Sequence, residues 1–297
     1  MKIALVTNKN YHHKFWVSQL YKNHNVSLVI HPNNSSSIFN LNLYRKKFFD
    51  YGILYFFLKI LSLIFGFFSK FGLRKSIKIA EKKFFYKYLD DYERIPDHLI
   101  KNIKTINCDE AVSLIRKNNI DVICFLGGEI AKKEFIQSAR FCFNFHSGIS
   151  PFYNGNKTNF HAVSDFRPNF CGGTLMKMNE RIDGGEILAH YFCSIEKDDF
   201  ASDLFMKGIL GSVMLYNSLL TNLHKEISGI KQHKSLRYLK NIDWTIINDI
   251  NLSNFYRKKG MHNFVREEKI ILYFNNKYNL SDLYSITLDI LLKKNTN

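Results

Sequence analysis

Short apolar runs alternate along the chain with segments in which apolar side chains recur every three or four positions. Residues 2–7, 26–30 and 121–126 are apolar runs bounded by polar residues, which is typical of buried strands. Residues 16–22 and 109–118 show the helical spacing. A strand, a helix and a second strand at the start of the chain predict a parallel sheet with right-handed crossovers.

The same pattern continues downstream and defines the predicted organisation. Residues 134–139 suit a short helix, 142–145 a strand, Asp203–His224 a long amphipathic helix, and 270–274 a strand. We therefore expect an α/β fold with a doubly wound, mostly parallel sheet. The predicted parts are a main domain over 1–224, a helical insertion at about 40–105, and a small basic C-terminal region at 225–297.

The stretch Tyr51–Phe68 is the most apolar part of the chain, with 14 apolar residues among 18 if Tyr is counted. Lys59 and Ser62 interrupt it, and a second, basic amphipathic helix is expected over 74–89. Three interpretations stay open. We favour a helix packed on the core or in a homodimer contact over a helix on a membrane surface. A transmembrane span is disfavoured by the central lysine.

Charge is unevenly distributed along the chain. The net charge is +16, and residues 44–104 hold 14 basic and 6 acidic residues, whereas 141–200 hold 5 basic and 7 acidic residues. The basic flanks suit phosphates, nucleic acid or anionic lipid, or are simply a solvated surface. The five cysteines lack metal-ligand spacing. The apolar start is also too short for a secretory signal, so we expect a cytoplasmic protein without a bound metal.

The segment Phe143–Gly155 carries the candidate chemistry. Asn144 and His146 lie two apart on a predicted strand, so they face the same side, at the carboxyl end of the sheet where α/β folds bind ligands. Asp183 follows 37 residues later and precedes two glycines. No complete G-x-G-x-x-G motif is present, which disfavours a nicotinamide site.

An amide donor, an imidazole and a carboxylate suit acyl transfer to an amine. Asn144 and a protonated His146 can donate hydrogen bonds to a tetrahedral oxyanion. Asp183 can hold His146 in a useful orientation and charge state, and can help to accept the proton that leaves the amine. Each motif alone is commonly structural, but the combined order and spacing are far more specific.

With the loop between them, these residues resemble the core of the folate-dependent formyltransferases, a superfamily that includes methionyl-tRNA and sugar N-formyltransferases. The resemblance covers about 120–190 well, and 1–30 only by fold pattern. The matching residues are Asn144, His146, Pro151, Tyr153, Gly155, Gly172, Thr174, Ile182, Asp183 and Gly185. Three positions depart from the family pattern, Asn154, Met176 and Gly184, and these put the acceptor in doubt.

The resemblance implies a Rossmann-like core, 10-formyltetrahydrofolate as the formyl donor, and Asn144, His146 and Asp183 as catalytic residues. It places the pterin ring by Leu126, Gly127 and Gly128 and by the backbone near Ile182 and Asp183. The candidate substrate contacts are Ser147, Tyr153, Lys157, Asn159 and His161. By contrast, surface structural roles are expected for His12, His13, His98 and His262.

The acceptor is expected to be an amino sugar linked to a nucleotide. The basic flanks suit a diphosphate, and the C-terminal region lacks the run of short strands expected of a tRNA-binding barrel. Competing possibilities are a methionyl-tRNA formyltransferase, a formyltetrahydrofolate hydrolase, and a non-catalytic protein at a membrane surface. A peripheral membrane contact and a homodimer also stay open.

Overall fold

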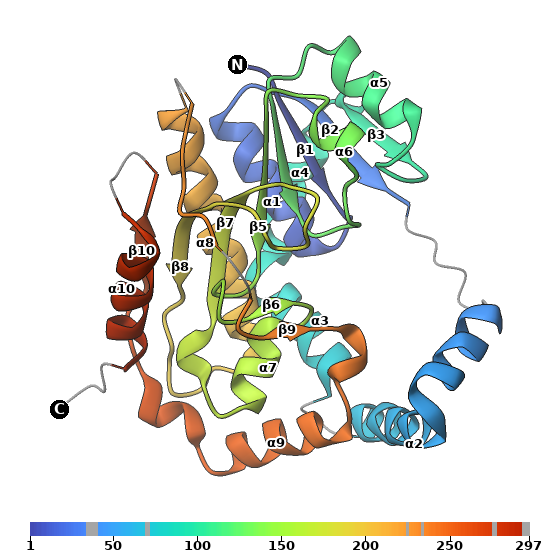
Figure 1. Cartoon of the computed structure of the whole chain (residues 1–297), viewed down its shortest axis with the longest axis vertical. Coiled ribbons are helices and arrows are strands. Elements are labelled where there is room, and N and C mark those ends of the chain that lie inside the picture. The colour runs from blue at the N-terminus through green and yellow to red at the C-terminus, as the bar shows by residue number, and fades with distance from the viewer. Residues whose placement is uncertain (34–40, 69–71, 224–225, 233–234, 275–277, 293–297) are drawn as a thin grey trace.

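The computed structural model describes residues 1–297 except 34–40, 69–71, 224–225, 233–234, 275–277 and 293–297 (Figure 1). For 41–48, 67–68 and 291–292 only the helical backbone is described. The two ends of the described chain lie at opposite sides of the molecule (Figure 1).

A central sheet of eight strands organises the fold, in the order β10-β8-β7-β5-β4-β1-β2-β3. The strands from β5 to β3 are parallel, whereas β7, β8 and β10 join antiparallel. The mostly parallel α/β fold predicted from the sequence is thus confirmed. The strands are β1 Ile3–Thr7, β2 Val26–Pro32, β3 Ile100–Ile103, β4 Val122–Leu126, β5 Phe141–His146, β7 Gly172–Lys177, β8 Ile187–Phe192 and β10 Lys269–Leu272.

Helices cover both faces of this sheet. The first helices are α1 Tyr11–Asn23, α2 Leu41–Phe68, α3 Leu73–Phe85, α4 Leu89–Glu93, α5 Asp109–Lys117 and α6 Lys133–Ile136. The later ones are α7 Thr158–Ser164, α8 Ala201–Asn222, α9 Ile246–Arg257 and α10 Leu280–Leu292. Short 3₁₀ helices are η1 Tyr86–Tyr88, η2 Asp97–Leu99, η3 Pro168–Phe170, η4 Asn241–Asp243 and η5 Gly260–Phe264.

Alternate residues of each central strand enter two separate apolar cores. Ile3 and Leu5 of β1 pack in the core under α1, α3 and α8, whereas Ala4 and Val6 pack in the core under α5. Every residue of β1 is buried, which explains why the strand is apolar without alternation. The two cores are the physical reason that the sheet is covered on both faces.

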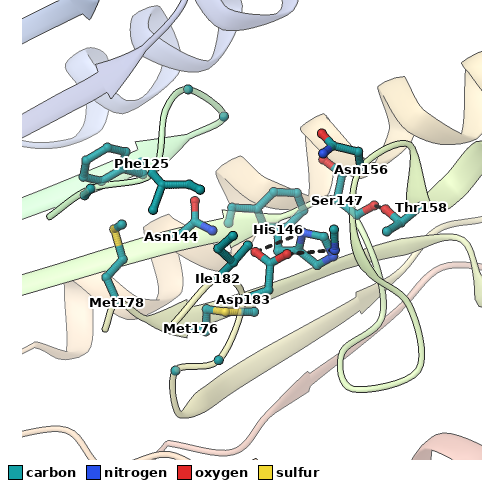
Figure 2. A pocket seen from close by; sticks show the side chains of 18 of the residues that line it. Phe125, Asn144, His146, Ser147, Asn156, Thr158, Met176, Met178, Ile182 and Asp183 are labelled. Carbon is teal, nitrogen blue, oxygen red and sulfur yellow. Dashed lines mark hydrogen bonds and ion pairs between the residues drawn. The ribbon is translucent and has the colours of Figure 1, made fainter. Parts of the chain in front are cut away.

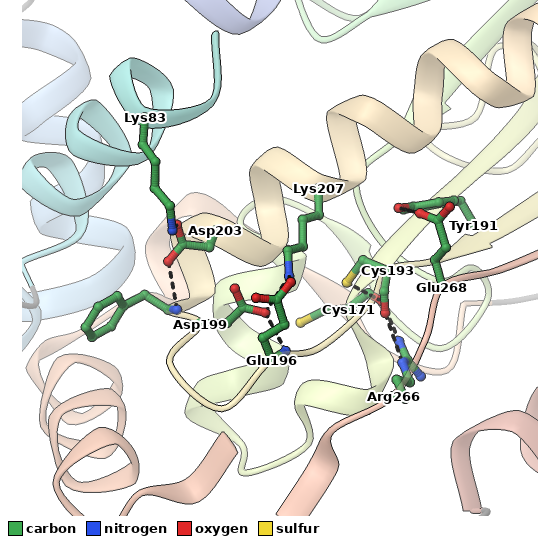
Figure 3. A network of polar contacts seen from close by, with 11 residues as sticks. Lys83, Cys171, Tyr191, Cys193, Glu196, Asp199, Asp203, Lys207, Arg266 and Glu268 are labelled. Atoms are coloured by element: carbon green, nitrogen blue, oxygen red, sulfur yellow. Dashed lines mark hydrogen bonds and ion pairs between the residues drawn. The ribbon is translucent and has the colours of Figure 1, made fainter. Parts of the chain in front are cut away.

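The C-terminal region contributes to both sheets. Strand β10 extends the central sheet beside β8, and β9 (Tyr238–Leu239) pairs with β6 (Asn154–Gly155) in a small second sheet. Arg266 donates hydrogen bonds to the carbonyl oxygens of Cys193, Cys171 and Asn169 at 2.8–3.0 Å. Figure 3 shows this contact beside the buried Lys207, which pairs with Asp199 and Glu196 at 2.7 and 3.0 Å.

Helix α2 projects from the body of the molecule (Figure 1). It bends sharply at Gly52, whose φ of 71° lies in the left-handed region that glycine adopts without strain. Among the described residues, Phe49–Gly66 and Ala201–Asn222 are long and apolar enough to cross a membrane. The second is mostly buried and forms a core helix of the domain, whereas no residue of the first is buried.

Two histidines differ from the sequence expectation. His12 and His13 on α1 are buried, not on the surface. His12 Nδ1 is hydrogen-bonded to Glu81 of α3, and His13 Nδ1 to the Thr7 hydroxyl. Burial lowers the pKa of His13 well below its ordinary value, and the neighbouring His12 lowers it further. These polar partners come from other elements, so the local pattern could not indicate them.

Candidate active site

A cavity of about 470 Å³ opens at the carboxyl ends of β4 and β5. Asn144 and His146 of β5 both line it, as expected for residues two apart on a strand. Asp183 reaches the same cavity from the loop between β7 and β8. Figure 2 shows the three side chains facing one another. Its volume lies within the range of small-molecule sites.

The imidazole of His146 lies between two hydrogen-bond acceptors. Its Nε2 is 3.0 Å from the Tyr153 carbonyl oxygen, and its Nδ1 is 3.4 Å from Asp183 Oδ1. An imidazolium presents an N–H group to each of them, whereas a neutral ring can serve only one. The Nδ1 contact is longer than an ordinary hydrogen bond, so a substrate atom can compete for this N–H.

Asp183 is fixed by contacts to its backbone and its carboxylate. Its φ is 47°, in the left-handed region. The Gly155 N–H donates to Oδ2 at 2.9 Å. The Asn154 and Gln232 side-chain amides donate to its carbonyl oxygen at 3.1 and 2.8 Å. One carboxylate oxygen is therefore held by the backbone while the other faces His146.

The loop that follows His146 is held by threonine hydroxyls. Thr174 on β7 donates to the Gly148 carbonyl oxygen at 2.6 Å and accepts from the Ser150 N–H at 2.9 Å. Thr158 donates to the carbonyl oxygen of Ser147. Because Thr174 lies directly opposite His146 in the β5–β7 register, the loop is tied to the strand that carries the catalytic candidates.

Asn144 differs from its neighbours in having an unengaged side chain. Across the part of the chain that the structure describes, no residue is hydrogen-bonded to its amide. The backbone of Asn144 lies in the middle of the sheet, between Phe125 of β4 and Met176 of β7. The backbone of Asn144 is thus fixed by the sheet, and its Nδ2 is a donor that is available to a ligand in the cavity.

One end of the cavity combines open backbone with apolar side chains. Gly127 and Gly128 have positive φ, and a Cβ at Gly128 would meet no other atom within 4 Å. Figure 2 shows the side chains here, Phe125, Met176, Met178 and Ile182. Leu126 does not line the cavity; it is buried, and its carbonyl oxygen accepts from Thr7 at 2.7 Å.

Ser147 and Lys157 line the opposite end. Lys157 has a left-handed backbone, with φ of 54°, and its Nζ lies 5.6 Å from the centre of the Trp244 ring. Burial lowers the pKa of Lys157 to about 8, and the nearby Lys59 contributes to this lowering. This amine is a cation that titrates close to neutral pH.

Three other predicted substrate contacts have structural partners. Asn159 lines the cavity, but its amide bonds the backbone N–H and carbonyl oxygen of Gly172. The Tyr153 hydroxyl donates to Asp165 at 3.0 Å, and Tyr153 does not line the cavity. His161 is buried outside the cavity, against Trp244. Burial lowers the pKa of His161 to about 4, with Arg237 as the next cause.

Some residues at the site were not predicted from the sequence. Gln232 does not line the cavity but bonds the carbonyl oxygens of Asp183 and Gly185, and it lies 49 residues after Asp183 in a polar region without a motif. Tyr238 of β9 and Ile77 of α3 line the cavity. Only the folded arrangement brings these residues to the site.

Comparisons with known proteins agree with the fold. Residues 90–209 match the family model described as Formyl transferase. A methionyl-tRNA formyltransferase of Caldicellulosiruptor saccharolyticus is 33% identical over 138 residues, which are 46% of this chain and 40% of that protein. One of Streptococcus pyogenes is 25% identical over 185 residues, 57% of this chain and 58% of that protein. The chain thus matches about half the length of these curated relatives.

Solved structures share the fold over most of their length. A 4-N formyltransferase from Francisella tularensis has a TM-score of 0.52 at 14% identity, covering 84% of this chain and 86% of that one. An N-formyltransferase from Helicobacter canadensis, solved with folinic acid and dTDP-3-aminofucose, has a TM-score of 0.51 at 17% identity, covering 87% and 82%. Residues 90–209, which contain Asn144, His146 and Asp183, are thus a region of the formyltransferase superfamily.

Proposed function

We propose that this protein transfers the formyl group of 10-formyltetrahydrofolate to a primary amine. The observation that carries the proposal is the meeting of Asn144, His146 and Asp183 in one cavity. His146 Nδ1 lies 3.4 Å from Asp183 Oδ1, and Asn144 lines the same cavity. Together they supply what acyl transfer needs, which is an oxyanion donor, a polarising imidazole and a carboxylate.

In the proposed reaction the amine nitrogen forms a bond to the formyl carbon, and the bond from that carbon to the folate nitrogen breaks. The products are a formamide and tetrahydrofolate. The Asn144 amide and the His146 N–H stabilise the negative charge that develops on the formyl oxygen. Asp183 orients His146 and receives the proton that leaves the amine, which then passes to the folate nitrogen.

The end of the cavity at Gly127 and Gly128 suits the formyl donor. A flat pterin ring needs apolar contact on its faces and backbone groups at its edge. Phe125, Met176 and Ile182 supply the first, and the loop after β4 exposes backbone without side chains. This arrangement supports a folate in that position and leaves the other end of the cavity for the acceptor.

The proposed acceptor is an amino sugar linked to a nucleotide. Lys157 at the acceptor end supplies a cation for a phosphate group, with its Nζ 5.6 Å from the centre of the Trp244 ring. The Helicobacter canadensis protein was crystallised with dTDP-3-aminofucose, which makes nucleotide-linked amino sugars the first acceptors to test.

Formylation of methionyl-tRNA is the second candidate, because the Caldicellulosiruptor and Streptococcus relatives are methionyl-tRNA formyltransferases. A tRNA acceptor would make the rate depend strongly on salt, since phosphate contacts release counterions. A nucleotide sugar has far fewer phosphates and predicts a weak salt dependence. A hydrolase would instead release tetrahydrofolate without any amine, and a non-catalytic protein would release none.

The test is release of tetrahydrofolate from 10-formyltetrahydrofolate, with and without nucleotide-linked amino sugars or charged initiator tRNA. Release that requires one amino sugar supports the proposal and identifies the acceptor. Release that requires the tRNA supports the second candidate. Release without any amine indicates hydrolysis. If folate binds but no tetrahydrofolate is released with any acceptor, the result contradicts formyl transfer to these amines.

A further inference from the structure

The projecting helix α2 turns a row of apolar side chains away from the domain. Ile53, Phe57, Ile60 and Ile64 recur at intervals of three or four residues, so they form one face. Each of them is 50–74% exposed. A helix that covers a soluble domain normally turns its apolar face inward, whereas this one turns its apolar face outward.

Lys59 and Ser62, two polar residues of α2, face the domain, whereas Asp50 is exposed. Lys59 Nζ donates to the carbonyl oxygens of Trp244 and Asn241 at 2.7 and 3.3 Å. The Ser62 hydroxyl donates to the carboxylate of Asp249 on α9. These contacts fix the orientation of α2, so the outward direction of its apolar face is built into the fold.

The helix that follows α2 carries a cluster of cations. Helix α3 contacts α2 and begins five residues after it ends. Exposed cations on α3 and in the short helix after it are Arg74, Lys75, Lys78, Lys82, Lys83 and Lys87. The one acidic residue between Leu73 and Tyr88 is Glu81, which is buried and bonded to His12. The surface beside α2 is thus basic.

The positive charge of the protein distinguishes between the surfaces that could cover the apolar face of α2. A second copy of the chain would bring the same basic segment and another net charge of +16 to the contact, which repel each other. An anionic lipid surface attracts these cations and accepts apolar side chains below its headgroups. A transmembrane position would bury Lys59 in hydrocarbon and break its contacts to the segment before α9.

We propose that α2 docks the protein on an anionic membrane surface. The helix lies in the plane of the interface, with Ile53, Phe57, Ile60 and Ile64 among the upper parts of the acyl chains. Lys59 and Ser62 stay bonded to the domain, and the cations of α3 contact lipid headgroups. Ile77 of α3 lines the active-site cavity, so docking brings the cavity close to the membrane.

The test is sedimentation of the full chain with vesicles of phosphatidylcholine alone or mixed with phosphatidylglycerol. We expect binding to the mixed vesicles, little binding to phosphatidylcholine alone, and weakening by salt. The double variant Phe57→Ser/Ile60→Ser should bind about tenfold or more weakly, because it removes two inserted side chains. Arg74→Gln and Lys75→Gln should each weaken binding roughly fivefold.

Met214→Ser on α8 is the matched control, since it also removes an exposed apolar side chain but should bind as the wild type does. Circular dichroism melting shows that each variant is folded. Binding that is absent, or equal in the double variant and the wild type, overturns the proposal. A lipid-free dimer that the double variant abolishes also overturns it, in favour of a second copy. These readouts do not depend on formyl transfer.

Discussion

The active-site cavity and the projecting helix α2, which we call the arm, place polar and apolar side chains in opposite ways. In the cavity, the polar side chains of Asn144, His146 and Asp183 face the space where a ligand binds, and the surrounding strands hold them. In the arm, Lys59 and Ser62 face the protein, and a row of apolar side chains is exposed. The cavity is fixed from several elements, whereas polar contacts to one segment orient the arm.

This difference predicts that the two regions can be altered independently. Changes in the cavity should remove chemistry without affecting where the protein is located. Changes on the outer face of the arm should affect membrane association without affecting the rate of formyl transfer. A cavity variant that loses membrane association, or an arm variant that loses formyl transfer, would contradict this independence.

The largest effect is expected at His146. Removing an oxyanion donor typically costs a factor of about 100–1000 in kcat, so His146→Ala should lose at least that factor while the protein stays folded. Asn144→Ala and Asp183→Ala should also lose most turnover. The measurement is kcat for tetrahydrofolate release, with the exposed His98→Ala as control. Near-normal turnover in His146→Ala would rule out the oxyanion scheme.

A pair of glycine substitutions compares the packing of the two regions. A Cβ at Gly185 would overlap the carbonyl oxygen of Lys177, whereas a Cβ at Gly66 in α2 meets no other atom within 4 Å. Gly185→Ala should lower the free energy of unfolding by about 1–3 kcal/mol and displace Asp183. Gly66→Ala should raise it by about 0.5–1 kcal/mol. Urea denaturation measures both, and equal effects would contradict the difference in packing.

Gln232 is expected to have a smaller effect on catalysis. Its amide holds the carbonyl oxygens of Asp183 and Gly185, so Gln232→Ala should loosen the loop and reduce kcat roughly tenfold, by analogy with the loss of other supporting contacts. Gln137→Ala, at an exposed position, is the control. An unchanged kcat would show that the backbone contacts of Asp183 suffice to position it.

The smallest effect is a pH dependence from Lys157. Its pKa of about 8 means that its charge is present below that pH and is lost above it. Binding of an anionic acceptor should therefore weaken as the pH rises through about 8, and the acceptor KM should rise roughly fivefold. Lys157→Gln should remove this rise, whereas Lys104→Gln should keep it. A persistent rise in Lys157→Gln would assign the titration to another group.

Much of the central fold could be predicted from the sequence. Strands β1 and β4 are short apolar runs bounded by polar residues, and the alternation in β5 places Asn144 and His146 on the same side of the strand. The position of Asp183 followed from the family resemblance. The Gln232 contact could not be predicted, because it depends on a packing partner 49 residues distant.

The arm shows a different limit of prediction. Apolar residues at helical spacing indicate that a face is covered but not what covers it, so packing on the core or in a homodimer contact is the interpretation that the pattern of 51–68 favours. The outward direction of that face depends on Lys59 and Ser62 meeting the segment from Asn241 to Asp249. Those partners lie more than 180 residues away along the chain, and no local pattern encodes them.

The most direct test of the central claim follows the formyl group itself. The donor carries an isotopic label in its formyl carbon, and mass spectrometry detects the label in a nucleotide-linked amino sugar after incubation with the wild type or His146→Ala. Labelled formamide with the wild type, and at least about 100-fold less with His146→Ala, is the predicted result. Labelled formate with an unmodified amine, or equal labelling by both proteins, would contradict transfer by this site.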